Sequence, residues 1–94
     1  MVINNVLLKL KDSDNAKEVQ SVLLGMKGKI EALIEIQVEE NIRFGQSSYD
    51  LLLITKFASI EDMDRYLSHP IHLEVASYIG SVLDQQASLC YEVN

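Results

Sequence analysis

Three side chains that can exchange protons lie close together in the sequence, around its only proline, Pro70. They are Tyr66, His69 and His72. Histidine is the side chain whose ordinary pKa lies nearest to neutral pH, and a tyrosine hydroxyl can donate or accept a hydrogen bond. These residue types at this spacing could therefore serve acid–base chemistry, provided that the fold brings them together.

Each of the three residues also has a structural interpretation. His69 precedes a proline, so its side chain is free to cap the helix that Pro70 begins. His72 lies in the first turn of that helix, where the helix N-terminus disfavours the imidazolium and leaves a neutral base; a histidine half buried against a sheet gives the same pattern. Tyr66 fits either a core residue or a donor pointing into a cavity between helix and sheet.

Motifs for other kinds of chemistry are not found. The two histidines lack the further ligands that a metal site needs, so no metal is expected. Ser47 and Ser48 follow Gly45 without the strand-to-helix context of a serine nucleophile. The four glycines are scattered and form no phosphate-binding loop, so no nucleotide or other cofactor is expected.

The elements that would position these residues follow from the hydrophobic periodicity. Alternating residues predict strands over 2–11, 32–39, 49–57 and 86–93, and spacings of three and four predict helices over 14–27, 60–68 and 70–83. Ser59 is expected to cap the second helix, whose apolar stripe would be Ile60, Met63 and Leu67. In the second strand, Ile34 and Ile36 are expected on the apolar side and Leu33 on the other side.

This order of elements predicts an α+β domain of the ferredoxin-like kind. Four strands with two helical crossovers favour an antiparallel sheet with the helices on one face. The other face would present apolar side chains to water, namely Ile3, Leu7, Leu33, Leu52 and Ile54. A second copy packed sheet to sheet is the expected cover, so we expect a homodimer with twofold symmetry.

The composition limits the partners. The 94 residues, 48% of them hydrophobic, correspond to one domain over residues 1–94. The net charge of -6 disfavours nucleic acid and anionic lipid surfaces. The sequence starts without a leader pattern, and its longest apolar run, 51–54, is too short to span a membrane. The single Cys90 makes no internal disulfide, which favours a cytoplasmic location.

Three stretches resemble the stress-responsive α/β-barrel family, also called the Dabb family, over essentially the whole chain. They are VLLKLKD at 6–12, YDLLLITKFASIEDMDRYLSHPIH at 49–72 and YEV at 91–93. The most specific part is the pattern F-x-S-x-E-x-x-x-x-Y-x-x-H-P-x-H, matched by Phe57, Ser59, Glu61, Tyr66, His69, Pro70 and His72. The resemblance implies a dimeric α+β barrel in which two ferredoxin-like sheets pack face to face.

The resemblance also implies a site. Most members of the family have no assigned reaction, but the plant olivetolic acid cyclase uses a tyrosine and a histidine for an aldol cyclisation without a cofactor. By that pattern His72 would take a proton beside a carbonyl and Tyr66 would hold the resulting oxyanion. The cavity would be lined by residues that share the helix-facing side or the helix junction: Asn4, Val6, Leu8, Ile36, Leu51, Leu53 and His69.

Two positions depart from the family pattern. Many members carry a histidine in place of Asn4, and a glycine often stands in place of Glu40. Asn4 can donate and accept hydrogen bonds, but it cannot carry a proton at neutral pH. A relay through this position is therefore not expected here.

Three functions are compatible with these residues. The first is a homodimer that binds a small apolar or carbonyl-containing molecule and has no assigned reaction. The second is a cofactor-independent lyase or cyclase that uses Tyr66 and His72. The third is oxidation of quinol-like compounds, for which the only support is analogy with barrel monooxygenases of similar architecture.

Overall fold

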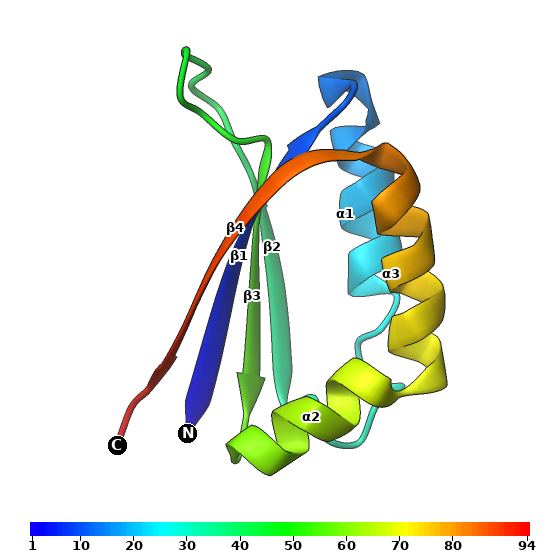
Figure 1. Ribbon diagram of the computed structural model, residues 1–94, viewed down its shortest axis with the longest axis vertical. Coiled ribbons are helices and arrows are strands. Elements are labelled where there is room, and N and C mark those ends of the chain that lie inside the picture. The colour runs from blue at the N-terminus through cyan, green and yellow to red at the C-terminus, as the bar shows by residue number, and fades with distance from the viewer.

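The computed structural model describes all residues, 1–94, as one antiparallel sheet covered on one face by helices (Figure 1). The strands are β1 (Val2–Leu10), β2 (Glu35–Glu40), β3 (Leu51–Phe57) and β4 (Leu83–Glu92), in the spatial order β2-β3-β1-β4. The helices are α1 (Ala16–Leu24), α2 (Ile60–Ser68) and α3 (Pro70–Val82), with a short 3₁₀ turn at Ser13–Asn15. The predicted ferredoxin-like α+β class is confirmed.

The ends of α1 follow from local side-chain chemistry. Asp12 accepts a hydrogen bond from the backbone N–H of Asp14 at 2.9 Å and so caps the 3₁₀ turn that leads into the helix. The regular helix ends at Leu24, earlier than the predicted residue 27, and tighter turns continue the chain. Gly28 then adopts a φ of +76°, which favours glycine and lets the chain turn toward β2.

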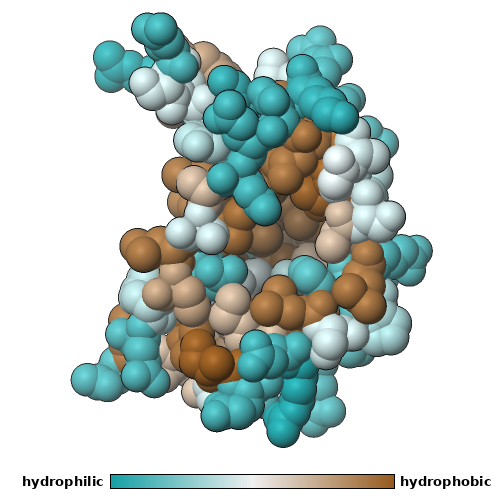
Figure 2. Space-filling view, viewed as in Figure 1, coloured by the Kyte–Doolittle hydropathy of each residue, from teal (hydrophilic) through white to brown (hydrophobic).

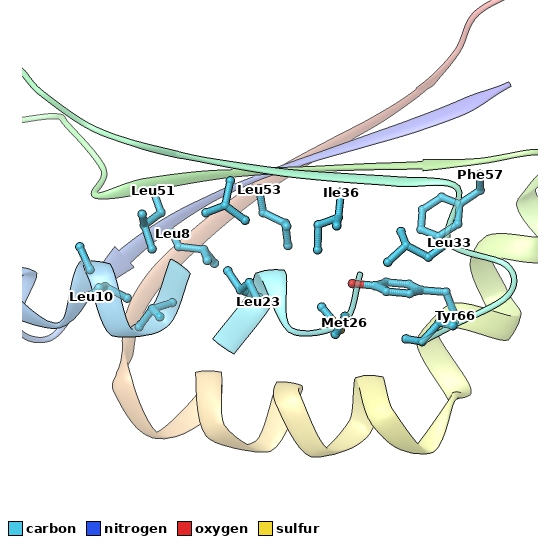
Figure 3. Close-up of a cluster of buried hydrophobic side chains, with 14 of the residues drawn as sticks. Leu8, Leu10, Leu23, Met26, Leu33, Ile36, Leu51, Leu53, Phe57 and Tyr66 are labelled. Atoms are coloured by element: carbon cyan, nitrogen blue, oxygen red, sulfur yellow. The ribbon is translucent and has the colours of Figure 1, made fainter. Parts of the chain in front are cut away.

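The central strands β1 and β3 pair over nearly their full length, with Leu8 opposite Leu51 and Val2 opposite Phe57. Because successive side chains alternate between faces, all four of these residues point to the helix layer. All four are at most 2% exposed. Figure 3 shows leucines of both strands facing α1.

One hydrophobic cluster fills the space between sheet and helices. Val19 and Leu23 of α1 and Met26 beyond its end meet the sheet residues, and α3 adds partly buried side chains such as Val75 and Ile79. No residue of α3 is fully buried, because this helix packs mainly on α1 and α2. The interior is therefore tightly filled beneath α1 and less so beneath α3.

The predicted phase of the second strand is wrong at its start. Leu33 is 7% exposed and belongs to the core, whereas Ile34 is 53% exposed. The reason is that residues 31–34 form a turn, and regular alternation begins only at Glu35. Leu33 therefore does not belong to the open face of the sheet, where we had placed it.

Asp50 is the second departure from the alternation. The pattern placed it on the open face of a strand, but it is 6% exposed and precedes β3. Its carboxylate accepts a hydrogen bond from the backbone N–H of Leu10 at 2.7 Å, and its own N–H donates to the carbonyl of Leu8 at 2.9 Å. Asp50 thus joins the ends of β1 and β3.

The face of the sheet opposite the helices carries an apolar centre. Leu7 of β1 lies opposite Leu52 of β3, and Leu89 and Tyr91 of β4 flank them. Leu7, Leu89 and Tyr91 are 38%, 67% and 43% exposed, respectively. None of the helices combines the length and the apolarity that crossing a membrane requires.

We expect Asp50→Ala to lower the free energy of unfolding by about 1–3 kcal/mol, because the buried N–H of Leu10 then loses its acceptor. Asp50→Asn retains an acceptor oxygen, so its loss should be smaller. Urea unfolding followed by circular dichroism measures both variants, with Asp84→Ala as an exposed control. A loss for Asp50→Ala no larger than that of the control would contradict the assigned role.

Candidate functional site

The junction between α2 and α3 positions the proton-carrying residues. Ser59 caps α2 by accepting a hydrogen bond from the N–H of Asp62 at 3.1 Å, as predicted. The helix must end before Pro70, and His69 adopts the extended conformation, with φ -66° and ψ 137°. Pro70 then begins α3, where its missing N–H costs no helical hydrogen bond.

His69 is the N-cap of α3. Its Nδ1 accepts a hydrogen bond from the backbone N–H of Ile71 at 3.1 Å. The residue also lines a surface hollow of about 560 Å³ together with charged side chains such as Asp62 and Arg65. Neither Tyr66 nor His72 lines this hollow. The geometry therefore separates His69 from the other two residues and gives it the capping role considered above.

His72 folds back over the end of α2. Its Nδ1 donates to the carbonyl oxygen of Leu67 at 3.0 Å, a role that assigns the proton to Nδ1 and leaves the lone pair on Nε2. Burial lowers the pKa of His72 below 6.5, and the hydrogen bond to Leu67 only partly offsets this shift. The ring is therefore neutral near pH 7, and Nε2 is available as a base.

Tyr66 packs directly against His72. The two ring centroids are 4.5 Å apart, and on its other side Tyr66 contacts Phe57 of β3 at 5.0 Å. The tyrosine is 3% exposed, and burial raises its pKa to about 12. Its hydroxyl stays protonated and points between the sheet and the helices, toward Ile36 and Met26 (Figure 3).

The predicted lining residues do share the helix-facing side, but they differ in access. Leu8, Ile36, Leu51 and Leu53 are each at most 8% exposed and form part of the core cluster. Val6 packs against that cluster and, like Asn4, is only partly buried. Figure 2 shows apolar side chains in a hollow between the two layers. Of the predicted set on the sheet, only Asn4 and Val6 combine this orientation with accessible surface.

Thr55 was missed by the sequence reasoning. It lies on β3 directly opposite Asn4, on the helix-facing side, and is 1% exposed. Its hydroxyl has no hydrogen-bond partner, a situation that costs about 1–3 kcal/mol in a buried position. A polar residue at an inward position of the alternating stretch 49–57 was the available signal.

Cys90 and Met63 also meet beside this site. Cys90 of β4 lies opposite Asn4 of β1, and its thiol is 3.8 Å from the sulfur of Met63 on α2. Cys90 is exposed at the edge of the sheet. No three His, Cys, Asp or Glu side chains converge in a way that would hold a metal ion.

The chain belongs to the stress-responsive A/B barrel (Dabb) family. Residues 4–93 match the family described as Stress responsive A/B Barrel Domain. This match covers almost the whole chain and both helices of the junction. No curated protein matches the sequence.

Solved structures share the fold at low sequence identity. A dimeric protein of unknown function with a ferredoxin-like fold from Bacteroides fragilis is 22% identical, with a TM-score of 0.85, covering 98% of this chain and 95% of that one. A dimeric ferredoxin-like protein of unknown function from Thermobifida fusca is 16% identical, with a TM-score of 0.85 and coverages of 98% and 90%. A hydroxynitrile lyase from Passiflora edulis is 14% identical, with a TM-score of 0.84 and coverages of 99% and 93%.

The lowered pKa of His72 predicts a dependence of stability on pH. Between the folded pKa and the unfolded value of 6.5, the unfolded chain binds more protons, so the free energy of unfolding falls as the pH falls through this interval. We expect His72→Gln to reduce this fall. Urea unfolding at several pH values between about 7 and 5 measures it. The titration of His69 is common to both proteins, so identical pH dependences would contradict the prediction.

Proposed function

We propose that this protein is a homodimer that binds a small carbonyl compound between its helices and sheet, and that His72 and Tyr66 exchange a proton with it. The observation that carries this proposal is the direct packing of the Tyr66 ring on the His72 ring at 4.5 Å. The pair combines a base with a donor. It needs no cofactor, and none is proposed.

The proposed step is removal of a proton from the carbon next to the carbonyl. Nε2 of His72 accepts this proton, and the electron pair of the broken C–H bond moves to the carbonyl oxygen to form an enolate. Tyr66, whose pKa is raised to about 12, remains protonated and donates a hydrogen bond to that oxygen. Return of the proton, or attack of the enolate on a second carbonyl, completes an exchange or an aldol-type cyclisation.

Similarity of fold supports a lyase or cyclase only by analogy. The structure from Passiflora edulis is that of a hydroxynitrile lyase, and it superimposes on nearly the whole chain. A fold can host many reactions, so the proposal depends on the Tyr66–His72 geometry. Oxidation of quinol-like compounds has no comparable geometric support in this chain.

Binding without turnover is the second candidate. Leu8, Leu51 and Leu53 fill much of the helix-facing side, and His69 is engaged as a helix cap. In addition, Asn4 cannot pass on a proton. In this alternative Tyr66 and His72 would serve as polar groups that orient an apolar ligand.

The homodimer is proposed to form through the open face of the sheet. Leu7, Leu52 and Leu89 line a shallow hollow of about 400 Å³ at its centre, together with Asn5 and Ala87. An apolar surface of this kind is typical of a face that a second copy covers. The related structures from Bacteroides fragilis and Thermobifida fusca are both dimeric.

We also propose a cytoplasmic location. The only cysteine, Cys90, is unpaired and lies at the exposed edge of β4. A free thiol of this kind persists most readily in a reducing compartment.

Proton exchange is tested with acetophenone in D₂O, because replacement of its methyl protons by deuterium reports the proposed step without any further reagent. We expect the wild-type protein to accelerate the exchange, measured by proton NMR. His72→Ala and Tyr66→Phe should each slow it by about 10²-fold or more. Tyr49→Phe is the matched control and should exchange at the wild-type rate.

The same experiment separates the candidates. Wild-type exchange in His72→Ala would refute the catalytic role of that residue. Binding of acetophenone with no accelerated exchange would favour the second candidate. Oxygen uptake with a hydroquinone, retained after the His72 substitution, would instead support an oxidation.

Native mass spectrometry tests the dimer. We expect the wild-type protein to be dimeric and Leu52→Glu to be monomeric, because the substitution places a charge at the centre of the open face opposite Leu7. Leu73→Glu on α3, where Leu73 is 55% exposed, is the matched control and should remain dimeric. A well-folded wild-type monomer at low micromolar concentration would refute the proposed assembly.

A further inference from the structure

The hydroxyl of Thr55 is a buried hydrogen-bonding group without a partner in the protein. Leu53 and Phe57, its neighbours on the same side of β3, are apolar and cannot bond to it. The other buried hydroxyl without a partner belongs to Tyr78, whose pKa is raised by burial and by the nearby carboxylate of Glu18. Thr55 has no such charged neighbour on its face of the sheet.

Thr55 belongs to a row of residues that crosses the helix-facing side of the sheet. Ile36, Thr55, Asn4 and Cys90 are successive partners on β2, β3, β1 and β4. Directly opposed side chains on neighbouring strands lie about 4.5–5.5 Å apart at Cβ, so the Thr55 hydroxyl and the Asn4 amide are adjacent. Exposure increases along the row, from buried Thr55 through half-buried Asn4 to exposed Cys90.

The row lies beside the Tyr66–His72 pair. Phe57 follows Thr55 by two residues on the same side of β3, about 7 Å along the strand, and packs on Tyr66. The Tyr66 hydroxyl points toward Ile36, the residue at the closed end of the row (Figure 3). A ligand that enters from the β4 edge and reaches Tyr66 therefore passes over Asn4 and Thr55.

We propose that Thr55, together with Asn4, is a specificity-determining site that binds a second oxygen of the substrate. This inference rests on the proposed function, in which the first oxygen is the carbonyl held by Tyr66. The ligand class is thereby narrowed to carbonyl compounds that carry an additional hydroxyl or carbonyl group. The Thr55 hydroxyl donates to or accepts from this group, and the ligand supplies the partner that the protein lacks.

The matched variants are Thr55→Val, which has a similar shape but no hydroxyl, and Thr55→Ser, which retains the hydroxyl. Binding of acetophenone and of 2-, 3- and 4-hydroxyacetophenone is measured by NMR titration. We expect at least one hydroxy isomer to bind the wild-type protein about tenfold more tightly than acetophenone, the preference that one hydrogen bond gives. Thr55→Val should abolish this preference, and Thr55→Ser should retain it.

Thermal unfolding without any ligand gives an independent test. If the hydroxyl has no partner in the protein, Thr55→Val should raise the unfolding midpoint by a few degrees. A lowered midpoint would show that the hydroxyl is bonded within the protein, and it would overturn the inference whatever the ligands do.

The remaining outcomes distinguish this inference from the proposed function. Acetophenone binding with no preference for any hydroxy isomer, or a preference that survives Thr55→Val, overturns this inference alone. Failure of all four ketones to bind overturns the proposed function and the inference together. Loss of proton exchange in His72→Ala with the hydroxyl preference retained supports both.

Discussion

The chain changes direction at His69 and Pro70, and the arrangement of the proton-carrying groups depends on that change. Pro70 cannot continue α2, so the next helix must begin with a new cap, which His69 supplies. The turn brings His72 back over the last turn of α2, within hydrogen-bonding distance of the Leu67 carbonyl. Without the break, residues 66 and 72 of one continuous helix would point in different directions. The junction places their rings in contact.

The hydrogen bond from His72 to Leu67 has a chemical consequence as well as a structural one. It fixes the tautomer, because the ring nitrogen that faces the carbonyl must carry the proton. Burial disfavours the charged ring, so the other nitrogen keeps its lone pair near neutral pH. The Tyr66 ring covers one side of the imidazole and is itself held by Phe57 of the sheet. A helix junction and a core strand thus hold the base and the donor together.

The same side of the sheet serves both the core and the candidate site. Leu8 and Leu51 pack beneath α1 and are almost completely buried. Toward the other end and the β4 edge, Asn4 and Thr55 replace leucine-like residues, and α3 has no fully buried residue there. Stability therefore comes mainly from the part of the layer beneath α1. The part beneath α2 and α3 has room for polar groups, one of which remains without a partner.

The sequence by itself determined the class of fold, the order of elements and the helix break, because periodicity, caps and proline act over a few neighbouring residues. It also brought Tyr66 and His72 forward, through their residue types and the family resemblance. Only the tertiary structure decided that Leu33 turns inward and that Asp50 bonds to Leu10, since both depend on contacts far away in the sequence. It likewise decided that Thr55 is left without a partner, because whether a buried hydroxyl is bonded depends on strands and helices that meet only in the folded chain.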